Sequence, residues 1–325
     1  MIMRTFVRLI AAASLVSVGI ASAQAWPSKP VTVIVPFAPG AASDGIARIL
    51  AQELSASLGQ PVVVDNRPGA GGTTGPSLVA RATPDGHTIG LAATGAIVVN
   101  PHLLDGAPLN VKELAPVAKL ADIPLALAAH PASGFTNLAA FLSAGRTAAG
   151  GVNVGNNGQN TSQHLAAELL SRMTGVRMVA VPYKGSAPAA TALLGGEVPV
   201  AMVDLTSVYP HIKTGKLIGL GVTSAQRSKV APDLPTIGEG GVPGYAASAW
   251  MGLFAPAKTP PTVIAQIARA VQVVLAKPEV ESKLIALSAE PNYLGPAEFA
   301  SFLEVETAKW GKVIEATRTG ANKLP

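Results

Sequence analysis

The chain has 325 residues, 49% of them apolar and 13% charged, a balance that is typical of a compact globular protein and excludes a disordered one. Its Lys and Arg residues are scattered, with no basic run and few aromatic residues among them, which argues against a nucleic-acid-binding groove. It contains no Cys, so a disulfide, a thiolate metal site and a cysteine nucleophile are all excluded.

The first 25 residues have the pattern of a secretory signal peptide. Arg4 and Arg8 precede an apolar run at 9–20, and the small residues that follow fit cleavage near Ala23 or Ala25. An uncleaved membrane anchor is the alternative, but the run is short for a bilayer span of about 20 residues. Removing the two arginines lowers the formal charge from +5 to +3. We therefore predict an exported chain with no later membrane-spanning segment.

Strand-like and helix-like segments alternate over most of the mature chain. A β-branched run ends at Pro36, and apolar residues at helical spacing follow until Gly59. The same alternation predicts strands at 31–36, 62–64, 87–92, within 117–129, and at 152–155, 178–181, 198–203 and 217–222. Helices are predicted between them at 43–58, 95–103, 136–144, 161–174, 188–194 and 207–214. This order predicts an α/β fold of parallel sheets covered by helices.

The last quarter of the chain differs from the rest. After an apolar run at 250–254 it has three helical patterns, with no strand between them, at 260–276, 278–289 and 296–319. Such helices must pack on a sheet formed earlier, so we infer that the chain leaves a first lobe near Asp122 and returns to it near Trp250. The predicted domains are 26–122 plus 251–325 for the first lobe and 123–250 for the second. Two crossings make a hinge, and we expect a ligand to close the lobes.

Three strand-to-helix loops could hold a ligand at the carboxyl ends of the strands. In the first, 37–44, small residues and the free N–H groups of Gly40 to Ser43 at a helix start would attract a carboxylate. Ser43 or Asp44 could instead cap the helix, and capping is favoured for Asp44 because its charge would repel an anion. The second loop, 156–163, is polar and uncharged, although a solvated turn explains it about as well. In the third, 182–188, Tyr183 offers a flat ring and a hydroxyl and Lys184 a positive charge, although a surface lysine is usually only solvated.

Cofactor and catalytic patterns are missing. The glycine-rich stretch 69–75 fails the dinucleotide spacing at Thr74 and lacks a following Lys–Ser/Thr pair, so a closely packed, flexible connection accounts for it better. The five His residues show no metal-ligand spacing, and the chain has no nucleophile elbow. A secreted hydrolase using Ser43 or Ser162 with His164 is the remaining enzymatic alternative, but no third group that would orient the base is evident. We expect no enzymatic activity, no cofactor and no metal.

Several ordered motifs resemble one protein family along nearly the whole mature chain. The chain is similar to the Bug-type, TctC-like extracytoplasmic solute receptors of tripartite tricarboxylate transporters. The motifs that carry the resemblance are WPSKPVTVIVPFAPGAASDGIAR, VVVDNRPGAGGTTG with PDGHTIG, GNNGQNTSQHLAAELL, VPYKGSAPA with LLGGEVPVAMVDL, GKLIGLGVTSAQRS with LPTIGEGGVPGY, and WMGLFAPAKTP.

The resemblance implies a type II periplasmic-binding fold, two α/β lobes with a ligand cleft between them. It implies a monomeric periplasmic receptor that passes a small organic acid, such as a dicarboxylate or an aromatic carboxylate, to transporter membrane subunits. A sensor that signals to another protein is the alternative with the same ligand chemistry. Carried over by motif, the ligand-binding residues are Phe37, Gly40, Ala41, Ala42, Ser43 and Asp44; Thr94 and Gly95; Asn156, Asn157, Thr161, Gln163 and His164; and Tyr183, Lys184 and Asp204.

Overall fold

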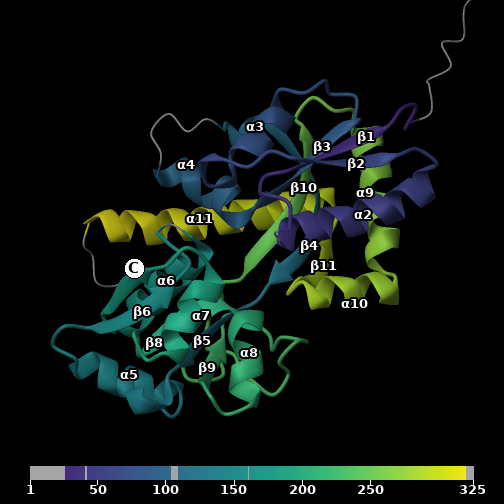
Figure 1. Cartoon of the computed structure of the whole chain (residues 1–325). Helices are drawn as coiled ribbons and strands as arrows, with labels where there is room; N and C mark the ends of the chain where they lie inside the picture. Colours follow the sequence, from purple (N-terminus) through teal and green to yellow (C-terminus); the bar gives the residue numbers. More distant parts are fainter. Residues whose placement is uncertain (1–25, 41, 104–108, 160, 320–325) are drawn as a thin grey trace, which may run out of the picture.

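The computed structural model describes residues 26–40, 42–103, 109–159 and 161–319, with side chains as far as Glu315. Two mixed β-sheets, each covered by helices, form two lobes that Figure 1 shows one above the other. The expected fold class, α/β with two lobes, is therefore confirmed. The predicted signal segment with its cleavage sites and the predicted ligand residue Ala41 lie outside the described residues.

Sheet 1 forms the centre of the first lobe and has the strand order β11-β4-β10-β3-β1-β2. Strands β1, β2 and β3 are parallel, whereas β10 is antiparallel to both β3 and β4, and β11 is antiparallel to β4. Buried β-branched residues such as Val33 and Val35 explain why the first strand forms at the centre of the lobe. The strands are β1 (Val31–Val35), β2 (Val62–Asn66), β3 (Thr88–Ala93), β4 (Leu114–Ile123), β10 (Ala249–Pro256) and β11 (Glu290–Leu294).

Sheet 2 forms the centre of the second lobe and has the order β7-β6-β8-β5-β9. Strands β6, β7 and β8 are parallel, and β5 is antiparallel to its neighbours β8 and β9. The carboxyl ends of β7, β6 and β8 therefore lie side by side at one edge of the sheet. The strands are β5 (Leu125–Ala129), β6 (Val152–Asn156), β7 (Met178–Pro182), β8 (Val200–Asp204) and β9 (Ile218–Val222).

Helices cover both faces of each sheet. In the first lobe α2, α9 and α10 share one apolar cluster with sheet 1, and α3 and α11 pack on the other face. In the second lobe α5 and α6 lie on one face and α7 and α8 on the other. The α-helices are α2 (Ala42–Leu58), α3 (Thr74–Ala80), α4 (Asn100–Leu103), α5 (Leu138–Thr147), α6 (Ser162–Thr174), α7 (Ser186–Leu194), α8 (Leu205–Lys213), α9 (Pro261–Leu275), α10 (Pro278–Ala286) and α11 (Pro296–Thr319). The shorter helical turns are η1 (Ala70–Gly72), η2 (Gly95–Val99), η3 (Val111–Glu113) and η4 (Pro131–Ser133).

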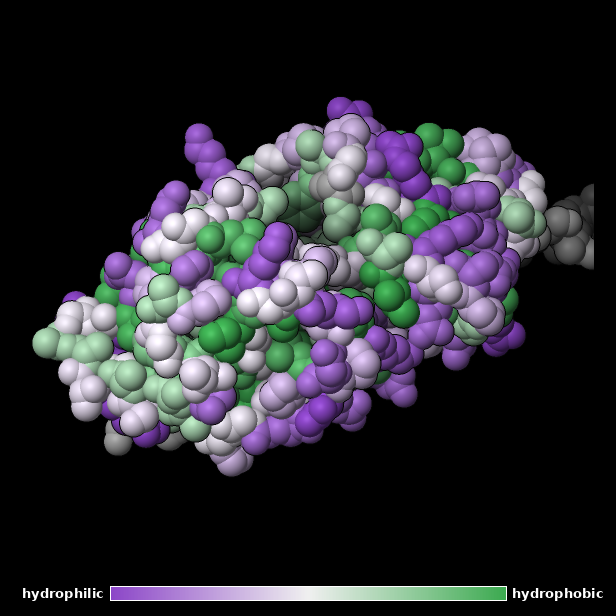
Figure 2. Space-filling view, turned by 60° about the horizontal axis from the view of Figure 1, so that its bottom comes forward, coloured by the Kyte–Doolittle hydropathy of each residue, from purple (hydrophilic) through white to green (hydrophobic). Residues whose placement is uncertain are grey.

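The apolar side chains gather in the interior of the lobes. Figure 2 shows hydrophobic residues on the surface in small groups between hydrophilic ones. Within the described residues, no helix combines the length and the apolar character that crossing a bilayer requires.

The two places where the chain crosses between the lobes lie side by side. Only Pro124 separates β4 in sheet 1 from β5 in sheet 2, and the returning strand β10 begins at Ala249, which pairs with Ile123. The predicted crossings at 122 and 250 lie next to these residues, and the exact division into domains stays a prediction. A second set of contacts joins the lobes away from the strands: Lys229 Nζ lies 2.6 Å from Glu281 Oε1, and Ser228 donates to Glu290.

Three expectations about the elements were wrong. The sheets are mixed rather than parallel, because β10 and β5 each run against their neighbours. The apolar run 117–129 forms two strands in different sheets, and Pro124 marks the change. The last quarter contains a strand, β11, which pairs with β4 at the edge of sheet 1. Its sequence EPNYL is short, includes a proline and is only partly buried, which suits an edge strand and hides it from an apolar pattern.

A buried aromatic cluster fixes α11 to sheet 1. The Trp250 ring meets Phe299 and Phe302 edge to face, each at 5.7 Å between centroids, and Phe254 lies 5.3 Å from Phe299. Gly252 leaves space for the Phe299 ring, because a Cβ at position 252 would lie 2.3 Å from Phe299 Cζ. The absence of a side chain at this strand position therefore sets how closely the helix approaches the sheet.

Candidate functional site

The first predicted ligand loop is organised by Asp44, whose side chain is buried at the start of α2. Its carboxylate accepts hydrogen bonds from the Gly40 amide at 3.0 Å, from Arg48 Nε at 2.9 Å and from Asn66 Nδ2 at 3.0 Å. The hydrogen bond from Arg48 is the largest of the effects that lower the pKa of Asp44, to about 2, against the opposing effect of burial. Asp44 therefore shapes the loop, although it lies inside the first turn of α2 and is not its N-cap, and the Gly40 amide that was expected to hold the ligand is occupied.

We expect Asp44→Asn to lower the free energy of unfolding at pH 7 by about 1–2 kcal/mol, because an amide oxygen cannot accept all three hydrogen bonds. The loss is no larger because Arg48 is exposed and solvent screens its ion pair with Asp44. The folded-state pKa lies below the usual value near 3.9, so ionised Asp44 stabilises the fold above about pH 4. That contribution is lost as the pH falls through about 2. Thermal unfolding of both chains at pH 7 and near pH 2 measures it. Asp65→Asn, at a more exposed pair with Arg67, is the control, and an equal loss there would contradict the assignment.

The start of α2 offers hydrogen-bond donors to a ligand. Among the described residues, the amides of Ala42 and Ser43 have no acceptor, as the first turn of a helix leaves them. The Ser43 hydroxyl is buried and has no hydrogen-bond partner within the described part of the chain. A buried hydroxyl without a partner costs stability, so a hydrogen bond to a bound ligand would explain why this hydroxyl is kept. Of the predicted donors of the first loop that the structure describes, those of Ala42 and Ser43 are therefore left for a ligand.

Phe37 and the glycine-rich stretch form one packed unit beside this loop. Gly72 has φ +88°, and a Cβ there would lie 3.0 Å from Phe37 Cζ. Asn66 Nδ2 also donates to the Phe37 carbonyl at 3.0 Å. The stretch is therefore the closely packed connection that the sequence predicted, and it holds the Phe37 ring in place.

Thr94 and Gly95 follow β3 and differ in what they contact. Thr94 is fully buried, and its hydroxyl accepts the Trp250 amide at 2.8 Å, so it ties β3 to the crossing strand β10. Gly95 opens η2, has no positive φ, and a Cβ there would meet nothing within 4 Å. Of this pair, Gly95 faces open space at the carboxyl end of a central strand, which is where ligands bind in open α/β sheets.

In the second lobe, Asn156 and Thr161 hold the polar loop in shape. Asn156 is fully buried at the end of β6, and its Oδ1 accepts the Gly158 amide at 2.9 Å. The Thr161 hydroxyl donates to the Gly158 carbonyl at 2.8 Å and accepts the His164 amide at 3.3 Å as the cap of α6. Both residues are therefore used by the fold, as the solvated-turn interpretation expected of a capping threonine.

Four side chains tie together the loops after β6, β7 and β8. Ser186 Oγ donates to Asn157 Oδ1 at 2.7 Å and accepts the Asp204 amide at 3.0 Å. Gln163 Nε2 donates to Asp204 Oδ1 at 2.5 Å. Burial raises the pKa of Asp204, and the bonds from Gln163 and Ser186 oppose the shift. Ser186 was missing from the predicted site residues, although the motif VPYKGSAPA places it at a helix start.

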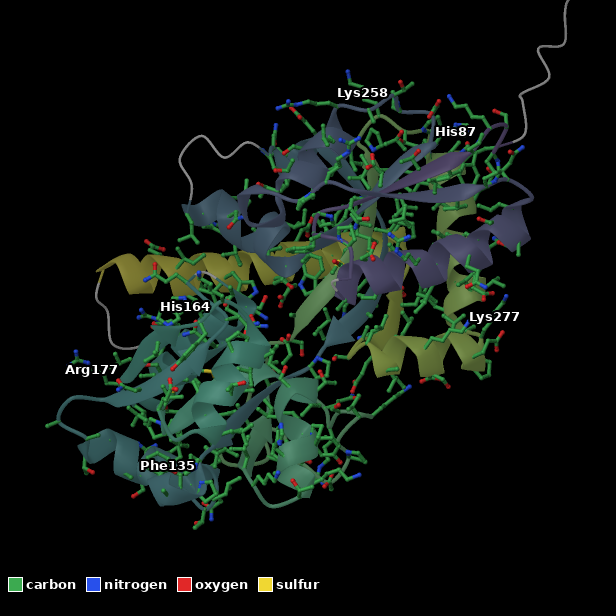
Figure 3. All side chains as sticks on the ribbon, in the orientation of Figure 1. His87, Phe135, His164, Arg177, Lys258 and Lys277 are labelled. Atoms are coloured by element: carbon green, nitrogen blue, oxygen red, sulfur yellow. The ribbon has the colours of Figure 1, made fainter. Side chains whose placement is uncertain are left out.

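The remaining predicted residues of the second lobe lie apart from this network. Figure 3 places His164 on α6 on the side facing α11, and burial lowers its pKa while Glu168 raises it. The Tyr183 ring is partly buried and packs against the apolar cluster under α7, where its Cε2 would lie 3.4 Å from a Cβ at Gly155. Lys184 is exposed.

Contacts between the lobes bring the start of α2 near the end of β8. Leu287 packs on Gly45 in the first turn of α2, and a Cβ there would lie 2.7 Å from Leu287 Cδ1. The next residue, Ser288, is bonded through its hydroxyl to the Thr206 hydroxyl at 2.5 Å. Thr206 follows Asp204 by two residues. The donors at α2 and the Asp204 network therefore face the same part of the lobe boundary.

Two cavities lie away from the predicted ligand residues. One of about 1180 Å³ lies between α11 and the residues Ile97, His102 and Val111 of the first lobe, and another of about 580 Å³ lies at the hinge. Neither includes a predicted ligand residue. Within the described part of the chain, no three His, Asp or Glu side chains are grouped to hold a metal ion.

The comparisons with known proteins agree on one family. The model of the tripartite tricarboxylate transporter family receptor, TctC, matches residues 46–318. Protein BugT of Bordetella pertussis is 36% identical over 298 residues, which cover 91% of each chain. The crystal structure of a TctC solute-binding protein from Polaromonas superposes with a TM-score of 0.80, at 29% identity over 89% of this chain and 99% of the other.

Two further similar structures contain a ligand. Rpa4515 of R. palustris with adipate has a TM-score of 0.76 and is 33% identical over 91% of this chain and 98% of its own. MatC of Rhodopseudomonas palustris with bound malate has a TM-score of 0.73 and is 32% identical over 89% of this chain and 100% of its own. Both ligands are dicarboxylates.

Proposed function

The chain belongs to the tripartite tricarboxylate transporter receptor family, TctC, and on that premise we propose that it captures a small carboxylate and delivers it to the membrane subunits of a transporter. The family's members are periplasmic solute-binding receptors, not enzymes, so the expected absence of enzymatic activity is confirmed and the hydrolase alternative is wrong. Adipate and malate in two related proteins make dicarboxylates the first candidates. We expect the receptor to act as a monomer in the periplasm.

The observation that carries the proposal is the start of α2. Among the described residues, the amides of Ala42 and Ser43 and the buried Ser43 hydroxyl are donors without an acceptor. A carboxylate accepts such bonds, and the positive end of the helix adds to them. Asp204, whose pKa is raised by burial, lies across the lobe boundary. The ligand is thus proposed to place one carboxylate at α2 and its other polar end at the Asp204 network.

We expect adipate or malate to raise the unfolding temperature of the purified mature protein. A ligand that binds only the folded state stabilises it by about 2.7 kcal/mol when its concentration is one hundred times Kd. A titration followed by differential scanning fluorimetry measures the shift. Dimethyl adipate, which has the same length but no charge, is the control. If no carboxylate shifts the temperature, or if the ester acts as strongly as adipate, carboxylate capture is contradicted.

A further inference from the structure

A second polar cavity lies at the hinge, outside the proposed ligand site. It has a volume of about 580 Å³ and is lined by both lobes: Lys119 of β4 and Phe302 and Lys309 of α11 come from the first, and Arg227 and Ser248 from the segment between β9 and β10. The volume lies in the range of pockets that hold small organic molecules.

The cavity is separate from the loops of the proposed function. Those loops follow β1 and β3 in sheet 1 and β6, β7 and β8 in sheet 2. The cavity lies instead at β4, β11 and the start of β10, and its residues from the second lobe follow β9, which β5 separates from β8 in sheet 2. It shares no residue with the predicted ligand set, so it requires an explanation of its own.

Its buried cation is Lys119, which is 3% exposed. The ammonium lies 2.6 Å from Asp122 Oδ1 and 4.6 Å from the centre of the Phe302 ring. Asp122 is shared, because Asn292 Nδ2 donates to its other oxygen at 2.5 Å. An ammonium has three N–H donors, and among the described residues only Asp122 accepts from Lys119. Lys119 can therefore donate to a further acceptor.

The acids that line the cavity are already occupied. Glu306 accepts from Lys309 and from Trp310 Nε1. Glu290 accepts from Ser228 and from the Val230 amide. The other cations of the lining are paired as well: Arg227 with Glu239, Lys229 with Glu281 and Lys309 with Glu306. The donor capacity that remains for an occupant is therefore that of the Lys119 ammonium, which an acceptor on the occupant would satisfy.

We propose that this hinge cavity binds a small organic carboxylate, with the carboxylate accepting from Lys119 and the carbon chain lying against apolar wall residues. Pro124, Pro291 and the Phe302 ring supply those apolar walls, which an inorganic anion would not use. Because both lobes line the cavity, its occupant contacts both sides of the hinge.

Butyrate is the probe, and the indole N–H signal of Trp250 in a protein with ¹⁵N-labelled tryptophan is the reporter, since Trp250 lines the cavity. Trp250→Phe identifies the signal among the three tryptophans. We expect a saturable shift with butyrate that chloride at equal ionic strength does not reproduce. Lys119→Met should weaken binding at least tenfold. Lys258→Met, at an exposed lysine that Figure 3 places far from the lobe boundary, should leave it unchanged.

Two further variants separate the possible failures. If Lys119→Met does not fold, Lys309→Met tests the same cavity from α11. Gly95→Leu, which blocks the proposed ligand site, should leave the Trp250 titration unchanged. The hinge site would be overturned if butyrate does not shift the Trp250 signal, or if it binds Lys119→Met and Lys258→Met equally well. It would also be overturned if the shift is lost in Gly95→Leu. The last outcome would leave the proposed function intact, because it assigns the butyrate to the ligand loops.

Discussion

Replacing Gly95 with leucine is expected to weaken binding of the carboxylate ligand more than tenfold, about 1.4 kcal/mol or more, without lowering the unfolding temperature. A Cβ at this position would meet no atom within 4 Å, and the backbone has no positive φ, so the backbone accepts a side chain here without strain. The leucine would fill open space at the carboxyl end of β3, where the ligand is proposed to lie. Removing a glycine from a helical turn also favours the folded state by up to about 1 kcal/mol.

Gly150→Leu is the matched control. Gly150 also has open space around it and no positive φ, but it lies in the turn before β6, away from the carboxyl ends of the strands. Isothermal titration with the best carboxylate from the thermal screen compares the two. Binding by Gly95→Leu that equals the wild type would exclude the end of β3 from the ligand site, and an equal loss in Gly150→Leu would show that the effect is not local.

The second large effect is expected on stability. Gly252→Ala should lower the free energy of unfolding by about 3 kcal/mol, the upper part of the range for overpacking a core. The new Cβ would lie 2.3 Å from Phe299 Cζ and 3.1 Å from Phe254 Cε2. Both rings are buried, so neither can move away without opening the contact between α11 and sheet 1. Denaturant unfolding of both chains measures the difference.

A compensating change tests the cause. Phe299→Leu removes the ring atoms that the alanine would meet. The loss of stability in the double variant should therefore be smaller than the sum of the two single losses, by at least 1 kcal/mol. Gly252→Ala alone with an unchanged midpoint, or losses that simply add, would contradict the packing explanation.

The alternation of strands and helices could be predicted because it is written in local patterns. Val31–Val35 followed by α2 is an apolar β-branched run and then helical spacing, and both formed where expected. The direction of β10 and β5 could not be predicted, since the pattern of a buried strand is the same in either direction. The edge strand β11 carries no apolar run at all, so only its pairing with β4 identifies it.

At the proposed site, the sequence indicated three loops but not the role of each side chain. Asp44, Asn156 and Thr161 all bond their own loops. The same residue types could have faced a ligand, and only their partners decide. Sequence also does not predict the direction of the Tyr183 ring. A ring that follows a strand can lie on either face of the sheet, and this one packs in the apolar cluster under α7. Gly95 is informative for the opposite reason, because its lack of contacts is visible only in three dimensions.

The place of β10 in sheet 1 also governs the order in which the chain can be assembled. All strands of sheet 2 lie within the continuous stretch 125–222, so that sheet is complete before β10 has been synthesised. Sheet 1 is different: β4 touches β3 only through β10, and the ladder joins residues as distant as Ala93 and Met251. Until residues 249–256 are available, β3 and β4 each keep an unpaired edge. The first lobe to begin synthesis is thus the last to close its sheet, and its edges stay open to other strands in the meantime.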